Sequence, residues 1–297
     1  MRRHTDPSEL AVRQRLHALT KSLPAAEKGD ATRLHEARVA TRRLREAVLL
    51  TASGPRARRV ERTVRRLTRA LGPVRELDVA MQTLDEIADT GGVAQAAIRA
   101  LKDSIRDERH RLPADMRRQI KDVNIDKLRR RAIAGTRTHH ARSSDAKGRA
   151  KARLRVAKRA SRLQAKIDNA AGIYLPDRLH DVRVAIKKLR YAMEVVNQLS
   201  GSRAAASLRT LKAAQDLLGH MHDLEVLTMR VRAMQASSGP PNLKLSAELD
   251  RLVRRLEAEC RQLHSEYIAM RKKLIAICDR TASIGSSRGD GSARSAA

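Results

Sequence analysis

One basic helical phrase contains the side chains best suited to chemistry. His35, Arg38, Arg42 and Arg45 are separated by three, four and three residues, so on an α-helix they fall within an arc of roughly 80°. A guanidinium group keeps its charge and forms paired hydrogen bonds with two phosphate oxygens. The stripe therefore predicts a surface that binds an anion rich in phosphate oxygens.

The same phrase occurs a second time. Residues 34–45 (LHEARVATRRLR) return 145 positions later as residues 179–190 (LHDVRVAIKKLR). The second stripe consists of His180, Arg183, Lys187 and Arg190. A second pair of phrases, LGPVRELDV at 71–79 and LGHMHDLEV at 218–226, follows at nearly the same offset. Two matched phrases in the same order predict an internal duplication.

The basic stripe of the first phrase lies beside an apolar stripe on the same helix. Leu34, Ala37, Thr41, Leu44 and Val48 occupy the neighbouring arc, which is the pattern of a helix that packs against a core. A solvated face would lie opposite this arc. We therefore expect the cations to line a groove or the seam between helices.

Further cations follow one another at helical spacing with few acidic residues between them. We expect these to extend the binding surface: Arg58, Arg62, Arg65 and Arg69, then Lys151, Arg155, Lys158 and Arg162, and finally Arg209 and Lys212. Like charges four residues apart cost a few tenths of a kcal/mol per pair, which favours an anionic ligand. An ordinary solvated face is the alternative reading of these lines.

Composition narrows the class of partner. The 297-residue chain has 41% apolar residues, which is enough to bury a core. Its net charge of +30 destabilises the compact state through repulsion between the cations, unless a polyanion neutralises them. It has no Trp or Phe and only three Tyr, whereas modules for single-stranded nucleic acid usually stack bases on aromatic rings. The composition favours a polyanion without bases. A sequence-independent nucleic-acid binder remains the alternative.

Catalytic and metal chemistry are not predicted. Arg38 and Arg42 would repel a cation beside His35, so we expect no metal site and no cofactor. Asp78 and Glu225 are expected to cap a helix or orient an arginine. The sequence contains neither a glycine-rich phosphate loop nor a Ser-His-Asp arrangement with suitable spacing. We expect a protein that is not an enzyme; an enzyme acting on a phosphate polymer is the other possibility.

Hydrophobic periodicity predicts an all-α protein with two sets of five helices. The expected helices are 7–22, 31–52, 56–71, 74–89 and 93–124, then 147–171, 177–199, 202–218, 221–236 and 244–279. Asp30 and Thr32 are the candidate caps of the second helix, and Gly54, Gly72 and Gly219 are expected to separate neighbouring helices. We expect a linker over 132–148 and a disordered tail over 281–297.

The chain shows no apolar run of the kind found in signal peptides and no stretch of membrane-spanning length. Its two cysteines fit a reducing compartment. We expect a soluble cytoplasmic protein with no membrane partner, and the sequence predicts no oligomeric state.

The repeated phrases together resemble the CHAD domain, the conserved histidine α-helical domain. The matching motifs are His35-x-x-Arg38 with Arg42-x-x-Arg45, then His180-x-x-Arg183 with Lys187-x-x-Arg190, and the two Leu-Gly phrases. Pro73 and Glu76 depart from the pattern within the first Leu-Gly phrase. The likeness extends over residues 1–280, with repeats at about 5–130 and 149–280.

This resemblance implies a fold and a function. The fold would be two pseudo-symmetric helical bundles around a basic central pore or groove. That groove would bind inorganic polyphosphate, and other phosphate-rich polyanions are further candidates as partners. Because some relatives are associated with polyphosphate granules, the resemblance also implies a place on such granules.

Overall fold

The computed structural model describes residues 6–90, 94–142, 145–200, 204–237 and 242–286. Over these residues every regular element is an α-helix, as the periodicity predicts. The helices are α1 (Pro7–Glu27), α2 (Ala31–Thr51), α3 (Gly54–Ala70), α4 (Gly72–Asp89), α5 (Gln95–Arg111), α6 (Pro113–Lys121), α7 (Ile125–Arg142), α8 (Asp145–Ala170), α9 (Pro176–Ser200), α10 (Ala205–Ser237) and α11 (Leu243–Ser286).

Short polar caps and prolines set the first helix boundaries. Asp6 accepts a hydrogen bond from the Ser8 amide, and Asp30 accepts one from the Arg33 amide at 2.8 Å. Such caps satisfy amide groups that a helix start leaves without partners. The Gly-Pro pairs at 54–55 and 72–73 begin α3 and α4. The predicted cap at Asp30 and both predicted Gly-Pro boundaries are confirmed.

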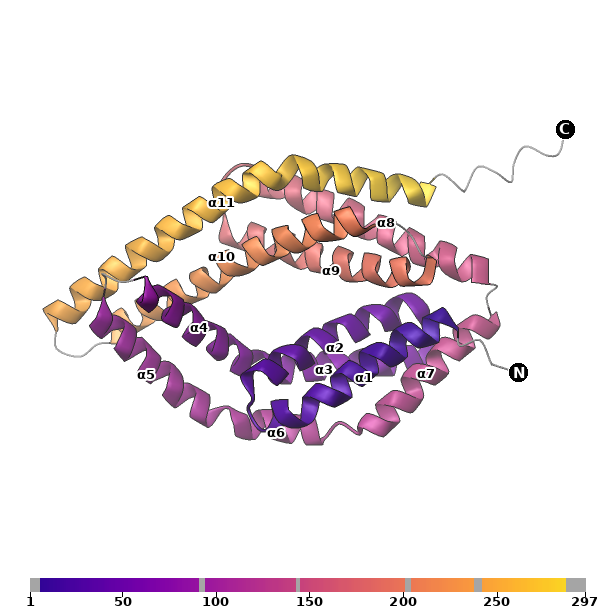
Figure 1. Ribbon diagram of the computed structural model, residues 1–297, viewed down its shortest axis with the longest axis horizontal. Helices are drawn as coiled ribbons and strands as arrows, with labels where there is room; N and C mark the ends of the chain where they lie inside the picture. The colour runs from indigo at the N-terminus through magenta and orange to yellow at the C-terminus, as the bar shows by residue number, and fades with distance from the viewer. Residues whose placement is uncertain (1–5, 91–93, 143–144, 201–203, 238–241, 287–297) are drawn as a thin grey trace.

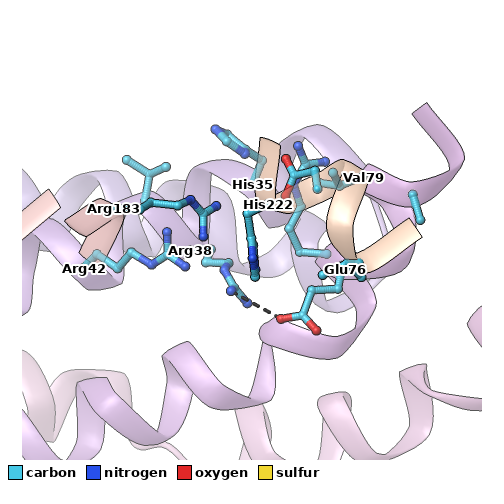
Figure 2. Close-up of a pocket in the computed structure, with 12 residues that line it drawn as sticks. His35, Arg38, Arg42, Glu76, Val79, Arg183 and His222 are labelled. Carbon is cyan, nitrogen blue, oxygen red and sulfur yellow. Dashed lines mark ion pairs between the residues drawn. The ribbon is translucent and has the colours of Figure 1, made fainter. Parts of the chain in front are cut away.

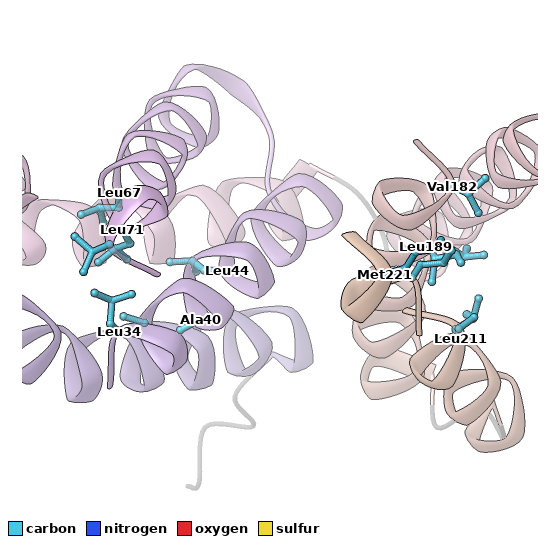
Figure 3. Close-up of a cluster of buried hydrophobic side chains, with 14 of the residues drawn as sticks. Leu34, Ala40, Leu44, Leu67, Leu71, Val182, Leu189, Leu211 and Met221 are labelled. Atoms are coloured by element: carbon cyan, nitrogen blue, oxygen red, sulfur yellow. The ribbon is translucent and has the colours of Figure 1, made fainter. Parts of the chain in front are cut away.

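The apolar stripes form the core. Leu34, Ala37, Thr41 and Leu44 are each 0% exposed and Val48 is 1% exposed, so the predicted buried face of α2 is confirmed. Figure 3 shows buried side chains gathered around α2 in one part of the molecule and around α9 and α10 in another. Fully burying a leucine side chain stabilises a fold by about 1.5–3 kcal/mol, so these stripes fix how α2 and α9 face their neighbours.

The chain divides into two halves that lie side by side (Figure 1). Helices α1 to α7 form the first half, and α8 to α11 form the second. Helix α2 contacts α8 and α9 across the boundary, while α4 and α5 contact α10 and α11 at the other end. The two helices that carry the repeated basic phrase, α2 and α9, therefore meet at the boundary between the halves.

The single helix predicted over 93–124 is wrong. Helix α5 ends at Arg111, α6 occupies Pro113–Lys121, and α7 begins at Ile125. Proline lacks the amide hydrogen that would continue the helical hydrogen bonds, so the helix is interrupted at this point although Leu112 keeps helical backbone angles. Pro113 is instead the first residue of α6, where its missing hydrogen costs nothing.

The break predicted at Gly219 is also wrong. Helix α10 is continuous from Ala205 to Ser237. A glycine inside a helix costs about 0.5–1 kcal/mol relative to alanine, and the apolar stripe of α10 outweighs this cost with residues such as Leu218 and Met221, each 1% exposed. The glycine has a different role, described below.

The segment expected as a linker, 132–148, is helical over its described residues. Ala132 and Thr136 are buried, and a Cβ at Gly135 would lie 3.4 Å from Cβ of Ala52. Small residues give little apolar signal in a sequence, yet they let α7 approach its neighbours closely. Helix α11 likewise continues to Ser286, beyond the predicted end at 279; the rest of the expected tail, 287–297, lies outside the described residues.

Candidate functional site

A pocket of about 180 Å³ lies between the two halves, and we call it the cationic pocket. It is bordered by residues of α2, α4, α9 and α10 (Figure 2). Its polar lining consists of His35, Arg38, Arg42, Arg75, Glu76, Arg183, His222 and Asp223. Four arginines thus share the pocket with two carboxylates.

The basic stripes of α2 and α9 meet at this pocket. Arg42 and Arg183 come from different helices, and in Figure 2 both side chains extend toward Arg38. Burial is the main cause that lowers the pKa of Arg183, and the nearby Arg42 lowers it further. The predicted groove residues His35, Arg38, Arg42 and Arg183 therefore line one site.

Lys187, which is not part of the pocket lining, is the most perturbed cation beside these arginines. Burial, followed by the charges of Arg183, Arg42 and Arg38, lowers its pKa to about 6. Burial, with Arg42 as the next cause, also lowers the pKa of Arg38 to about 10. Desolvation and like charges both disfavour the protonated amine. In the unliganded protein at pH 7 Lys187 is therefore mostly neutral, while the arginines keep their charge.

The two carboxylates only partly balance these charges. Arg38 Nη2 lies 3.6 Å from Oε1 of Glu76, a side chain that is 61% exposed. Burial raises the pKa of Asp223 despite the attraction of Arg183. An exposed ion pair contributes little. The pocket therefore retains an excess of positive charge that an anion can neutralise.

Histidines border the cationic pocket from both halves. Burial lowers the pKa of His35, and the charge of Arg75 adds to this effect. His180 lies against His222 with ring centroids 4.7 Å apart, and burial followed by His222 lowers its pKa. All these groups gain donor capacity when they are protonated. His220 points elsewhere, since its Nε2 lies 2.8 Å from Oε1 of Glu259.

Four polar residues of the pocket do not belong to the predicted basic stripes: Arg75, Glu76, His222 and Asp223. A signal was available, because Arg75 and His222 are each the fifth residue of their Leu-Gly phrase. Glu76 and Asp223 follow them at the sixth position. The repeated phrases on α4 and α10 thus supply the walls of the pocket, while the phrases on α2 and α9 supply the predicted arginines.

The glycines of the Leu-Gly phrases give the pocket arginines room. A Cβ at Gly72 would lie 2.9 Å from Nη1 of Arg38, which is closer than real contacts allow. A Cβ at Gly219 would lie 3.8 Å from Nε of Arg183, an ordinary van der Waals distance. Each arginine of the His-x-x-Arg motif therefore lies over a glycine, and the fit is tighter in the first half.

This difference predicts opposite outcomes for two alanine substitutions. Gly72→Ala should displace the Arg38 side chain and weaken anion binding by about tenfold, since a charge-assisted hydrogen bond contributes about 1.5–3 kcal/mol. Gly219→Ala should leave binding unchanged and stabilise α10 by about 0.5–1 kcal/mol. Titration calorimetry and urea unfolding measure the two effects. Equal affinities for both variants would contradict the role of Gly72.

The remaining predicted cations of the first half lie outside the cationic pocket. Arg45 Nε lies 3.5 Å from Oε1 of Glu61, and Arg65 contacts the same oxygen at 2.7 Å. Arg58, Arg62 and Arg69 are exposed. Arg45, the last residue of the basic stripe on α2, therefore pairs with an acidic residue of α3 and is not available to a ligand in the cationic pocket.

The second half shows the same change of role. Arg190 is 8% exposed, donates to Oε1 of Glu194 at 2.7 Å and lies 4.6 Å from the ring centroid of Tyr191. Lys212 forms an ion pair with Asp216, and Arg209 is exposed. These three predicted residues are not brought into the cationic pocket.

Helix α8 uses its arginines to hold α2. Arg155 donates to the carbonyl oxygen of Leu49, and Arg159 forms an ion pair with the buried Glu46. The other predicted cations of this helix, Lys151, Lys158 and Arg162, are exposed. The line predicted on α8 thus includes one residue that fastens the halves together, while the other three face solvent.

The acidic residues singled out earlier are engaged with protein groups. Asp78 accepts a hydrogen bond from Nε of Arg109 at 2.6 Å, so it orients an arginine as expected. Glu225 instead accepts from the Tyr174 hydroxyl at 2.8 Å. Within the described residues, no group of three His, Cys, Asp or Glu side chains is arranged to hold a metal ion.

Comparison with known proteins places this arrangement in a family. The CHAD domain profile matches residues 10–232, a range that includes every residue of the cationic pocket. The chain belongs to the CHAD family. The crystal structure of the CHAD domain from the plant Ricinus communis superimposes with a TM-score of 0.69 at 19% identity, and the match covers 91% of each chain. At this identity the likeness shows the CHAD fold alone.

No curated protein gives a significant match to this CHAD chain. The whole of α11 lies beyond the family match, although the helix packs along α8 and α10. None of the described helices combines the length and apolar character needed to cross a membrane.

Proposed function

We propose that this CHAD domain binds inorganic polyphosphate in the cationic pocket and does not alter it chemically. The observation that carries the proposal is the convergence of Arg38 and Arg42 from α2 with Arg183 from α9 on one pocket. Lys187 lies close enough to these three for each to lower its pKa. A chain with a negative charge on every phosphate offers each cation an oxygen partner.

The placement of aromatic residues favours polyphosphate over nucleic acid. No tyrosine lines the cationic pocket. Tyr191 and Tyr267 are 5% and 0% exposed, and Tyr174 is bound to Glu225. The described lining therefore offers no tyrosine for a base to stack on, and its rings are the imidazoles of His35 and His222. Competition between long-chain polyphosphate and single-stranded DNA of equal charge tests the proposal. If the DNA displaces polyphosphate at a comparable concentration, the pocket is not specific for polyphosphate.

The pocket also lacks a cluster of acids that would recruit Mg²⁺ for phosphoryl transfer. Its two carboxylates, Glu76 and Asp223, face arginines, which repel a metal ion. We therefore propose a protein that binds polyphosphate without reacting with it. We expect it where polyphosphate is found, in the cytoplasm and on polyphosphate granules. Release of orthophosphate from polyphosphate in the presence of Mg²⁺ would contradict the non-catalytic reading.

The affinity should fall steeply with salt. Binding releases counterions at about 0.7 per neutralised phosphate for a single strand, so the four pocket arginines together with Lys187 give a log–log slope of about −3.5. If the exposed lines on α3 and α8 also contact the ligand, ten contacts give about −7. Titrations between 50 and 300 mM salt measure the slope. An affinity insensitive to salt would exclude this mechanism.

The affinity should rise as the pH falls from 8 to 6. The pKa of Lys187 is about 6 in the free protein, and a bound polyanion raises it because it favours the charged amine. Binding then takes up a proton, and the affinity changes by up to about tenfold per pH unit for each proton taken up. Calorimetry in buffers of different ionisation enthalpy counts these protons.

Lys187→Arg provides the control for this proton uptake. Arginine keeps its charge throughout this range, so the contribution of position 187 should disappear from the pH profile. The lowered pKa values of His35 and His180 would leave a smaller dependence. Equal affinity of the wild type at pH 6 and pH 8 would contradict the linkage.

A further inference from the structure

A second pocket, of about 550 Å³, lies on another face of α2. It is enclosed by α1, α2 and α9, which lie next to one another in Figure 1. Its lining consists of Gln14, Arg15, Ala18, Lys21, Arg33, Glu36, Ala40, Arg43, Glu194 and Gln198. On α2, Arg43 and Ala40 lie roughly 100° or more around the helix from Arg38 and Arg42. The second pocket is therefore separate from the cationic pocket.

One carboxylate in the second pocket serves three guanidinium groups. Glu194 accepts from Nη1 of Arg190 at 2.7 Å, and its other oxygen lies 3.3 Å from Nε of Arg43. Burial lowers the pKa of Arg15, the charge of Glu194 raises it, and Arg43 lowers it again. Arg15 and Arg43 thus repel each other beside a single shared anion.

Both arginines have a buried Nε donor that forms no regular hydrogen bond. Nε of Arg15 has no hydrogen-bond partner within the described residues, whereas Nε of Arg43 has only the ion-pair contact of 3.3 Å with Glu194. Arg15 uses Nη1 for the carbonyl oxygen of Ala11 and for Oε1 of Gln198. A buried donor without a partner costs about 1–3 kcal/mol. The unpartnered Nε of Arg15 and the weakly paired Nε of Arg43 border the same pocket, which indicates a ligand that supplies acceptor oxygens.

The other lining groups describe the ligand further. Four cations and two carboxylates give the lining a net charge of +2, counted from its residues. Arg33 and Glu36 already form an ion pair with each other at 2.8 Å. Gln198 donates to Gln14 at 2.7 Å, so an amide pair borders the pocket and can bind hydroxyl groups. The lining contains no aromatic ring.

We propose that the second pocket binds a small phosphate dianion against Arg15 and Arg43, in competition with the carboxylate of Glu194. The dianion would be orthophosphate or the phosphate group of a small hydroxylated monoester. Its oxygens accept from Nε of Arg15 and, in place of Glu194, from Nε of Arg43. A dianion also balances the net charge of +2, which Glu194 and Glu36 leave unneutralised.

Calorimetric titration with glucose 6-phosphate and with orthophosphate tests the proposal. Arg15→Gln and Arg43→Gln should each weaken binding at least about tenfold, because each removes a charge-assisted contact. Glu194→Gln removes the competing charge and should tighten binding about tenfold. Arg13→Gln is the matched control, because Arg13 is paired with Glu9 outside the second pocket, and it should bind like the wild type.

The tighter binding expected for Glu194→Gln cannot result from misfolding, since a variant that does not fold cannot bind the ligand more tightly. Tighter binding of glucose 6-phosphate than of orthophosphate identifies an organic monoester, and equal binding identifies the inorganic ion. No binding of either probe to the wild type and to Glu194→Gln would overturn the proposal. So would unchanged binding in both Arg15→Gln and Arg43→Gln.

The two sites are tested independently. A variant with Arg38, Arg42, Arg183 and Lys187 replaced by alanine should still bind the small phosphate with unchanged affinity. Loss of the small phosphate in that variant would place it in the cationic pocket and refute a separate site. Polyphosphate binding by the wild type is measured separately, so failure of one proposal leaves the other standing.

Discussion

Replacing Arg38, Arg42, Arg183 and Lys187 with alanine should lower the affinity for polyphosphate by at least about a thousandfold. Each removed cation takes with it a charge-assisted hydrogen bond that contributes about 1.5–3 kcal/mol. The fold should survive, because these side chains repel one another in the unliganded protein. Titration calorimetry measures the affinity, and circular dichroism checks that the helices remain.

A matched control separates the cationic pocket from net charge. Arg58, Arg62, Arg69 and Arg162 are exposed and lie outside the pocket. Their replacement by alanine removes four charges, at least as many as the pocket variant loses. Only long-range attraction is lost, however, and that is screened beyond about 10 Å at 0.1 M salt. We expect a loss of only a few-fold. A loss as large as that of the pocket variant would move the binding surface to the exposed lines.

Replacing Lys187 with methionine should stabilise the free protein by about 2 kcal/mol near pH 7 and raise its melting temperature by about 5 °C. Burial among Arg183, Arg42 and Arg38 makes a charged amine unfavourable at this position, whereas methionine fills a similar volume without a charge. The same variant should bind polyphosphate more weakly and lose most of the proton uptake. Stability and ligand affinity thus change in opposite directions.

The pH dependence of this gain has a definite sign. The unfolded chain keeps the proton of Lys187 up to a pKa of 10.5, whereas the folded chain keeps it only up to about 6. Within this window the unfolded state binds more protons, so the wild-type protein loses stability as the pH falls. The advantage of Lys187→Met should therefore grow from pH 10 toward pH 6. Thermal unfolding across this range measures it.

The neighbouring Lys188 supplies the control for this experiment. It is exposed on α9, so Lys188→Met removes a charge without relieving burial. Its melting temperature should stay within about 1 °C of the wild type, because exposed substitutions usually change stability by less than about 0.5 kcal/mol. An equal gain in both variants would show that net charge, and not the surroundings of Lys187, sets the effect.

The sequence predicts the helices well wherever an apolar stripe is long. The buried face of α2 follows directly from the spacing of Leu34, Leu44 and their neighbours. The helix boundaries that are predicted wrongly lie at a proline and at a glycine, where the preference of the residue for breaking a helix competes with the packing of the helix. Pro113 divides a stretch that looks periodic, and Gly219 remains within α10 because the rest of that helix packs well.

Prediction of the site is limited by partners that come from other helices. Spacing alone identifies Arg38, Arg42 and Arg183 as members of basic stripes, but only the fold brings α2 and α9 together. Arg45 cannot be separated from them by sequence, since Glu61 reaches it from α3. Arg190 could have been, because its partner Glu194 is four residues away on the same helix.

The fastening of α2 to the second half has a consequence for measurements in salt. One turn after Arg42, Glu46 is paired with Arg159 of α8, and on the next turn the carbonyl of Leu49 accepts from Arg155. Arg43 meets Glu194 of α9 on another face of the same helix. The joint between the halves is thus itself partly ionic. Salt ions that weaken the attraction between the cationic pocket and its ligand also weaken the ion pairs that hold α2 against α8 and α9. The ligand should therefore dissociate at high salt faster than counterion release alone predicts.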